Sequence, residues 1–265
     1  MKIKYNSTKN SSSGQERLFD LVFRIFGYPN ALRLAQWKSI GRMLDFSDDI
    51  IVLDMGCGAG HYSYLIGKTT LCIAADILDT KPISIRLSQS EERCPYVMAN
   101  ALSMPFKSDS IDRILMSSLL QMVSDDRKIL DEAYRVLKDD GILVISVPLD
   151  YIFSSFSIEE KNHLIEEFHC HGKGFYSREE IHELISSSGF QIIESEFNPK
   201  KVLSFAYEIW LKICLQTSQK PFSLLTFPVL FPFALLDRIC NLECEGNEII
   251  ISARKFKIRS GQSVP

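Results

Sequence analysis

An apolar run that ends in alternating glycines constrains the fold of this chain more than any other feature. Residues 50–53 (IIVL) have the pattern of a buried strand, and DMGCGAGH follows directly, with glycine at 56, 58 and 60. Such a strand-to-glycine-to-helix transition is typical of parallel sheets, where free backbone N–H groups can approach a ligand closely. We therefore expect the main ligand site at the carboxyl end of the first strand.

Short apolar strands alternate with helices along the rest of the chain. Helices are expected from about 60, in the eighties and over 125–137 and 150–168, and two more precede the first strand within 17–44. Ser177 and Glu180 form a predicted capping box for a further helix that ends at SSSGF, 186–190. The predicted strands are 50–55, 71–75, 96–99, 111–116, 142–147, 190–196 and 248–254. This alternation predicts an α/β fold with a doubly wound, mostly parallel, Rossmann-like sheet that is covered on both faces.

The chain is long enough for one large domain with insertions, which we place at 15–258. The lead at 1–14, rich in Ser, Asn and Lys, and the tail at 259–265 are expected to be disordered. Within the domain we expect N-terminal helices at 15–48, a ligand-binding core at 49–148, and substrate or lid insertions at 149–176 and 198–246.

Charge and cysteine content exclude several classes of function. The net charge of −3 gives no basic surface for nucleic acid. The seven cysteines are odd in number and scattered, which favours reduced thiols in a cytoplasmic protein. Cys240 and Cys244 lack a second pair at zinc-finger spacing, so no metal site is predicted. The N-terminus has no apolar core for a signal peptide.

The glycine spacing argues against a dinucleotide. A Gly-x-Gly-x-x-Gly fingerprint that starts at Gly56 would need glycine at 61, where His61 stands. Asp54 would also repel a phosphate. A nicotinamide-dependent oxidoreductase therefore remains only an alternative, and a simple packing turn is the structural alternative for the loop alone.

Polar residues at the ends of the next strands point to a nucleoside without phosphates. Asp76 ends the second strand, where its carboxylate can accept hydrogen bonds from both ribose hydroxyls, and Ile77 offers an apolar face to an adenine. Asn100 and Ala101 follow the third strand and could read an adenine edge. Ser117 stands at the end of the fourth strand. Each residue alone has an equally good explanation as a turn or cap, but their common order does not.

The chain resembles the class I S-adenosylmethionine-dependent methyltransferases, particularly the small-molecule branch that includes quinone-biosynthesis enzymes. The resemblance covers roughly residues 35–197 and the last strand. It lies in Asp76 and in the motifs VLDMGCGAGHYS, NALSMPFKSDSIDRILMSSLLQMV, DEAYRVLKDDGILVISVP and FYSREEIHELISSSGF. It implies seven strands, of which the last is antiparallel, and S-adenosylmethionine as the cofactor. The residues that it assigns to the cofactor are Asp54, Gly56, Cys57, Gly58, Gly60, Asp76, Ile77, Asn100, Ala101 and Ser117.

Two positions depart from the family pattern. Asn100 stands where the family usually has Asp, which predicts weaker or altered cofactor binding. Gln121 stands where the family often has His, which puts a base role for that position in doubt. A noncatalytic cofactor-binding module, used for regulation or assembly, is therefore the alternative from another functional class.

The kind of methyl acceptor is constrained mainly by motifs that the sequence lacks. The fourth strand ends in LMSS, which lacks the Asn/Asp-Pro-Pro-aromatic motif of adenine and amide methylation and the Pro-Cys nucleophile of cytosine methylation. We therefore expect a small-molecule acceptor. His169, His171 and Tyr151 are weak candidates for a general base, and the alternative for the histidines is a surface position before the GKG turn.

The connection at 198–246 is unusually aromatic, and FSLLTFPVLFPFALL at 222–236 has no charged residue. This stretch is too short to span a membrane, and Pro228 and Pro232 are expected to break any helix in it. It could be a hydrophobic lid or a dimer contact. Alternatively, it could bind a lipophilic acceptor or make a shallow membrane contact, in which case the protein would be membrane-associated.

Overall fold

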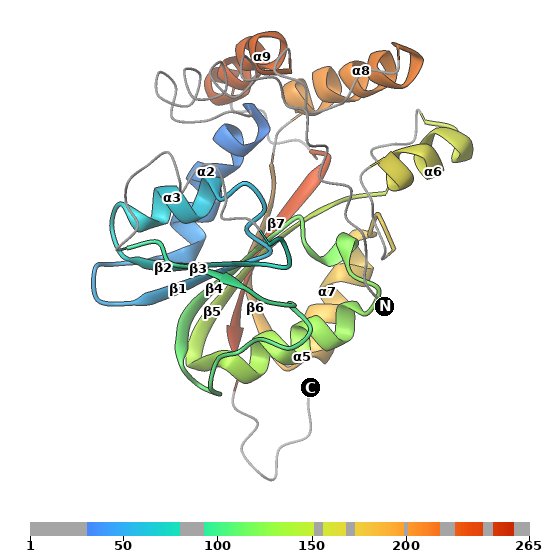
Figure 1. Cartoon of the computed structure of the whole chain (residues 1–265). Coiled ribbons are helices and arrows are strands. Elements are labelled where there is room, and N and C mark those ends of the chain that lie inside the picture. The colour runs from blue at the N-terminus through green and yellow to red at the C-terminus, as the bar shows by residue number, and fades with distance from the viewer. Residues whose placement is uncertain are drawn as a thin grey trace.

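A computed structural model describes residues 31–79, 93–150, 156–167, 173–198, 201–217, 226–240 and 246–256. The strands form a sheet in the order β3-β2-β1-β4-β5-β7-β6 (Figure 1). They are β1 (Ile51–Met55), β2 (Leu71–Asp76), β3 (Tyr96–Met98), β4 (Ile111–Ser117), β5 (Leu137–Pro148), β6 (Phe190–Phe197) and β7 (Glu248–Lys255). β7 is antiparallel to both β5 and β6, and the other described pairs are parallel. The predicted fold class and the antiparallel last strand are therefore confirmed.

Helices cover both faces of the sheet. The helical elements are α2 (Ala31–Leu44), α3 (His61–Gly67), the 3-10 turn η1 (Leu120–Met122), α5 (Asp126–Val136), α6 (Ile158–Glu167), α7 (Arg178–Ser187), α8 (Lys201–Thr217) and α9 (Thr226–Cys240). α2 and α3 pack on one face, and α5 and α7 pack on the other (Figure 1). Because side chains alternate along a strand, each strand contributes to both cores: Val52 lies in the α2–α3 core, and its neighbour Leu53 lies in the α5–α7 core.

Some element boundaries agree with the sequence prediction and others differ. The predicted capping box of α7 is present, because the Ser177 hydroxyl accepts from the Glu180 N–H at 3.1 Å and the Glu180 carboxylate accepts from the Ser177 N–H at 2.8 Å. The predicted strand at 142–147 begins earlier than expected, because Leu137 already pairs with Ile111 before the register shifts. The helix predicted over 150–168 is α6 in its described part.

The prediction that the two prolines break any helix in 222–236 is wrong, because α9 runs through this region with Pro232 inside it. Pro228 lies in the first turn, where backbone N–H groups have no intrahelical acceptor in any case. Pro232 does remove one hydrogen bond. The burial of Leu230 and Ala234 stabilises the helix against this loss.

α6, α8 and α9 share an apolar cluster with the first residues of α2, and Figure 1 shows all three at the same end of the molecule. The buried members of this cluster are Leu32, Phe156, Leu164, Leu203, Ala206, Tyr207, Leu211, Leu230 and Ala234. Of the segments that the structure describes, no helix combines the length and apolarity needed to cross a membrane. The predicted lead, tail, helix in the eighties and residues 17–30 lie outside the described residues.

Candidate functional site

The glycine loop adopts a backbone that favours glycine at every glycine position. Gly56, Gly58 and Gly60 have φ of 74°, 51° and 76°, in the left-handed region. The N–H groups of Gly56 and Cys57 donate to the Ala75 carbonyl at 2.8 and 3.0 Å, which folds the loop onto the end of β2. A methyl group added at Gly56 would lie 2.6 Å from a Leu119 methyl, whereas one added at Gly58 would meet no atom within 4 Å. Gly58 thus faces open space, in which a ligand could lie against the backbone.

Asp76 connects the loop to the neighbouring strand. One carboxylate oxygen accepts from the Gly58 N–H at 2.8 Å and the other from the Leu78 N–H at 3.3 Å. Ile77 and Met98, which is the register partner of Asp76, are exposed by 61% and 64%. Sequence reasoning did not select Met98, although its position at the end of the third strand was an available signal. Two exposed apolar side chains therefore lie next to the Asp76 carboxylate at this strand end.

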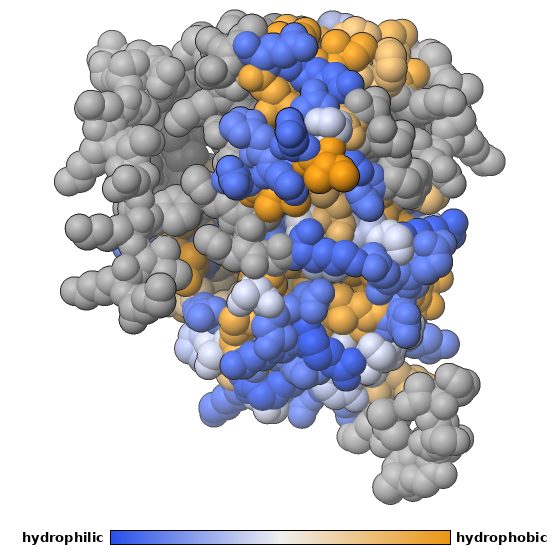
Figure 2. Space-filling model, turned by 90° about the vertical axis from the view of Figure 1, so that its right-hand side faces the viewer, coloured by the Kyte–Doolittle hydropathy of each residue, from blue (hydrophilic) through white to orange (hydrophobic). Residues whose placement is uncertain are grey.

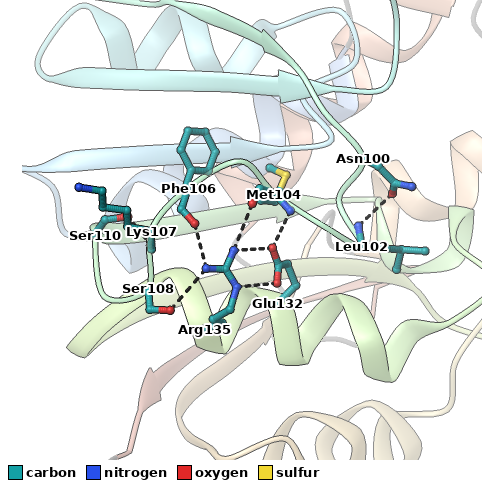
Figure 3. Close-up of polar contacts among 9 residues, drawn as sticks. All are labelled: Asn100, Leu102, Met104, Phe106, Lys107, Ser108, Ser110, Glu132 and Arg135. Atoms are coloured by element: carbon teal, nitrogen blue, oxygen red, sulfur yellow. Dashed lines mark hydrogen bonds and ion pairs between the residues drawn. The ribbon is translucent and has the colours of Figure 1, made fainter.

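Asn100 and Ala101 lie in the loop between β3 and β4, and hydrogen bonds from α5 hold this loop in place. The Asn100 side-chain oxygen accepts from the Leu102 N–H at 3.0 Å, which leaves the amide NH₂ available as a donor. Arg135 donates to the carbonyls of Met104 and Phe106 at 3.1 and 2.9 Å. Figure 3 shows these hydrogen bonds from α5 to the loop, with Glu132 beside Arg135 and Asn100 at the other end of the loop.

The loop residues Asp54 and Cys57 have pKa values that burial changes. The Asp54 carboxylate is only 2% exposed and accepts a hydrogen bond from the Ser63 hydroxyl. Burial raises the pKa of Asp54 to about 6, and the nearby Asp76 carboxylate adds to this effect. Burial also raises the pKa of the Cys57 thiol, which keeps it protonated. Asp54 is therefore buried at the end of β1, and its hydrogen bond with Ser63 connects β1 to the first turn of α3 across the glycine loop.

Polar side chains replace apolar ones at the carboxyl end of the α2–α3 face. Side chains alternate along a strand, so in β1, β4 and β5 the residue two positions after the last core residue on this face lies in this layer; in antiparallel β7 it is the residue two positions before the first core residue. This polar layer consists of Asp54 on β1, Ser117 on β4, Ser146 on β5 and Glu248 at the start of β7. Ser117 and Ser146 are paired in the sheet, and their hydroxyls are 3.1 Å apart.

Arg33 of α2 contacts the end of β4 in this layer. Its guanidinium donates to the hydroxyls of Ser117 at 2.6 Å and Ser118 at 3.1 Å. Ser118 has a left-handed φ of 53°, an uncommon conformation for a residue with a side chain. The guanidinium also lies 5.7 Å from the centre of the Tyr62 ring. Burial lowers the pKa of His61, the first residue of α3, to about 3, and the Arg33 charge contributes, so this imidazole is neutral.

Gln36, three residues after Arg33 on α2, connects Arg33 with Tyr62 and Glu248. Its side-chain oxygen accepts from Arg33 at 3.1 Å and from the Tyr62 hydroxyl at 2.9 Å. Its amide NH₂ donates to the Glu248 carboxylate. Burial raises the pKa of Glu248, whereas Arg33 and the hydrogen bond from Gln36 oppose the rise. Burial likewise raises the pKa of Tyr62 and of Tyr207 on α8.

The structure brings together residues that sequence reasoning selected and others that it missed. The residues predicted to bind the cofactor lie at the carboxyl ends of β1, β2 and β4 and after β3. Arg33, Gln36 and Glu248 were missed. Glu248 had a usable signal, because it is the first residue of a final strand that was expected to be antiparallel and so begins at this same edge. The weak base candidates His169, His171 and Tyr151 lie outside the described residues.

Comparison with known proteins identifies similar sequences. Residues 53–145 match the family described as a methyltransferase domain. The ubiquinone/menaquinone biosynthesis C-methyltransferase UbiE of Campylobacter jejuni is 28% identical over 170 residues, which cover 55% of this chain and 72% of that protein. The corresponding protein of Haemophilus ducreyi is 29% identical over 171 residues, which cover 54% of this chain and 64% of that protein.

Solved structures show the same fold. The geranyl diphosphate C-methyltransferase of Streptomyces coelicolor, solved with Mg²⁺, geranyl diphosphate and S-adenosyl-L-homocysteine, has a TM-score of 0.59 at 14% identity, covering 94% of this chain and 86% of that one. The YcgJ protein of Bacillus subtilis has a TM-score of 0.56 at 21% identity, covering 84% of this chain and 98% of that one.

Proposed function

As a class I S-adenosylmethionine-dependent methyltransferase of the small-molecule type, the chain needs a methyl acceptor, and we propose that this acceptor is a small apolar or lipid-linked molecule. The observation that carries the proposal is the apolar cluster of α2, α6, α8 and α9 next to the carboxyl edge of the sheet. The names of two relatives refer to carbon methylation, in ubiquinone/menaquinone biosynthesis and on geranyl diphosphate. Acceptors of related chemistry would suit a site bounded by this cluster.

The residues present fit S-adenosylmethionine better than a phosphate-bearing cofactor. Gly58 has open space above it, Asp76 has carboxylate lone pairs for ribose hydroxyls, and Ile77 is exposed for the adenine. Asp54 and Asp76 would oppose a diphosphate at this loop. We assign the cofactor to Asp54, Gly56, Cys57, Gly58, Gly60, Asp76, Ile77, Asn100, Ala101 and Ser117.

S-adenosylmethionine supplies a methyl group that its sulfonium has already activated. The protein has mainly to hold the acceptor nucleophile in line with that methyl group and to exclude water. The glycine loop and Asp76 would fix one side of this arrangement. The neighbouring helices α6, α8 and α9 would cover the acceptor on the other side, as the predicted insertions at 149–176 and 198–246.

A labelled-methyl experiment tests the proposal. The protein is incubated with a cell extract and methyl-labelled S-adenosylmethionine, and the label is followed into organic, aqueous and macromolecular fractions. We expect label in the organic fraction, and Asp76→Ala should reduce it when S-adenosylmethionine is limiting. Label in protein or nucleic acid would overturn the small-molecule class, and label confined to water-soluble products would overturn the apolar acceptor. Binding of S-adenosylhomocysteine without any labelled product would support a noncatalytic module.

We also propose that α8 and α9 contact a lipid surface. Phe205, Ile209 and Ile213 recur every four residues along α8, and their side chains are exposed. The exposed apolar residues of α9 are Val229, Phe233, Leu235 and Leu236. Figure 2 shows hydrophobic atoms gathered at the upper end of the molecule, where Figure 1 places these helices.

Charge supports an anionic lipid surface rather than a second copy of the chain. Residues 198–240 hold five basic and two acidic side chains, a net charge of +3 in a chain whose total net charge is −3. This segment is therefore attracted to anionic headgroups, whereas two copies of it would repel each other. An acceptor dissolved in the membrane could then reach the carboxyl edge of the sheet from the same side.

A further inference from the structure

Glu248 is a carboxylate on the acceptor side of the polar layer. β7 is antiparallel, so its first residue pairs with Pro148, the last residue of β5, and lies at the carboxyl edge of the sheet. Three strand spacings, about 14 Å, separate β7 from β1, which carries Asp54 and the glycine loop. The edge therefore has the carboxylates of Asp54 and Asp76 beside the predicted cofactor site and that of Glu248 three strands away from β1.

The surroundings of Glu248 hold its side chain in one place. Among the residues that the structure describes, the charged and titratable groups that face it are Arg33 from α2, Tyr62 from α3 and Tyr207 from α8. Gln36 is fully buried and donates to the Glu248 carboxylate, and its own orientation is fixed because its oxygen accepts from Arg33 and Tyr62. Glu248 itself is partly exposed, unlike Gln36 and Asp54.

Folding stability alone is a poor explanation for this carboxylate. Buried charge networks are often replaceable by apolar side chains without loss of stability, because desolvation offsets the attraction between the charges. Burial here raises the pKa of Glu248 above that of an ordinary glutamate, so its ionised form accepts a proton more readily. Asp54 has a raised pKa too, but it is buried at the end of β1 and hydrogen-bonded to Ser63.

We propose that Glu248 takes a proton from the methyl acceptor, whose nucleophile therefore carries a removable proton, as a hydroxyl, a phenol or an enol does. This inference rests on the proposed methyl transfer at this edge of the sheet. Gln36 and Arg33 act as positioning residues, because they hold the carboxylate and keep its ionised form accessible.

The chemical step balances without any further reactant. The carbon–sulfur bond of the sulfonium breaks, and its electron pair stays on sulfur, which becomes a neutral thioether. A bond forms between the methyl carbon and the acceptor nucleophile. The proton that the acceptor loses passes to ionised Glu248, which becomes a neutral carboxylic acid and later returns the proton to solvent.

The test compares Glu248→Gln with the wild type, using transfer of label from methyl-labelled S-adenosylmethionine into the cell extract from pH 4 to 9, a range that begins below the ordinary pKa of a glutamate. The wild-type rate should rise with pH along a limb set by the Glu248 carboxyl and then level off. Glu248→Gln should lower the plateau rate about 100-fold and remove the limb, because a positioned base contributes at least that factor. Glu248→Asp should keep the limb at a reduced rate, and binding of S-adenosylhomocysteine should change less than twofold in both variants.

Glu194→Gln is the matched control, because Glu194 is an exposed carboxylate on the adjacent β6, paired with Arg42. It should leave the rate and its pH profile unchanged. A Glu248→Gln protein that keeps the wild-type pH limb, at full rate or uniformly scaled down, would overturn the proton-transfer role and leave the methyltransferase proposal standing. A wild-type protein that binds S-adenosylhomocysteine but never transfers label would overturn both.

Discussion

Single residues at the carboxyl edge combine structural tasks with predicted ligand contacts. Asp76 accepts from the Gly58 N–H and also has lone pairs for a ribose. Gly56 is required by packing against Leu119, whereas Gly58 faces open space. Asp54 is buried at the end of β1 and carries a pKa that burial raises to about 6. Changes at these positions should therefore affect cofactor binding and folding to different extents.

Asp76→Ala should weaken binding of S-adenosylmethionine and S-adenosylhomocysteine by about 10-fold or more. The variant loses hydrogen bonds to a charged acceptor, each contributing about 1.5–3 kcal/mol, and it frees the Gly58 N–H. Calorimetric titration with both ligands measures the effect. Asp79→Ala, which removes an exposed carboxylate three residues later, should bind both ligands like the wild type. Equal affinity in Asp76→Ala would contradict the assignment of Asp76.

Asp54 should make the protein less stable as the pH rises from about 4 to 6. Its pKa is about 6 in the folded state against 3.8 ordinarily, so the folded state binds more protons in this interval. The stabilisation is complete below pH 4 and is lost as pH rises through 6, and it amounts to roughly 3 kcal/mol. Thermal unfolding of the wild type and Asp54→Asn across pH 4–7.5 measures this. A constant difference between the two proteins would show that Asp54 does not titrate in this range.

At the scale of elements, the same helices bury one side and expose another. α8 buries Leu203 and Leu211 in the apolar cluster, and exposes Ile209 and Ile213 on its outer side. α9 shows why local propensity is an incomplete guide, because it continues through Pro232 where packing against its neighbours stabilises it. The capping box at Ser177 shows the opposite case, in which a local signal was sufficient.

The exposed side of α8 should bind anionic lipid. Vesicles of phosphatidylcholine with about 30% phosphatidylserine, an anionic lipid that gives the surface a negative potential, should sediment the wild-type protein. Ile209→Ser combined with Ile213→Ser should reduce sedimentation several-fold at unchanged melting temperature. Ile193→Ser, at an exposed isoleucine of β6, is the matched control and should sediment like the wild type.

Two other outcomes would contradict the lipid proposal. Wild-type protein that stays in the supernatant at low salt would exclude the contact. A wild-type dimer in size-exclusion chromatography that the double variant dissociates would assign the same surface to a second copy of the chain.

At the scale of the whole molecule, the sheet brings distant segments to one edge. β1, β4 and β5 are parallel, so their polar ends meet, and antiparallel β7 adds its first residue, Glu248, to the same edge. α2 then connects the two halves of that edge, because Arg33 contacts the end of β4 and Gln36 contacts Glu248. The predicted cofactor side and the proposed acceptor side are thus joined by one helix.

The sequence by itself determined the fold class and predicted where the cofactor site lies. Strand alternation depends on side chains within a few residues of each other, and the three glycines encode a left-handed backbone directly. Only the tertiary structure decided which residues from distant segments share the edge. Arg33, Gln36 and Glu248 are separated by up to 215 positions in the chain, and no local pattern predicts that they meet. Their proximity, the pKa shifts that burial causes and the helical path through Pro232 all arise from long-range packing, which has no period in the sequence.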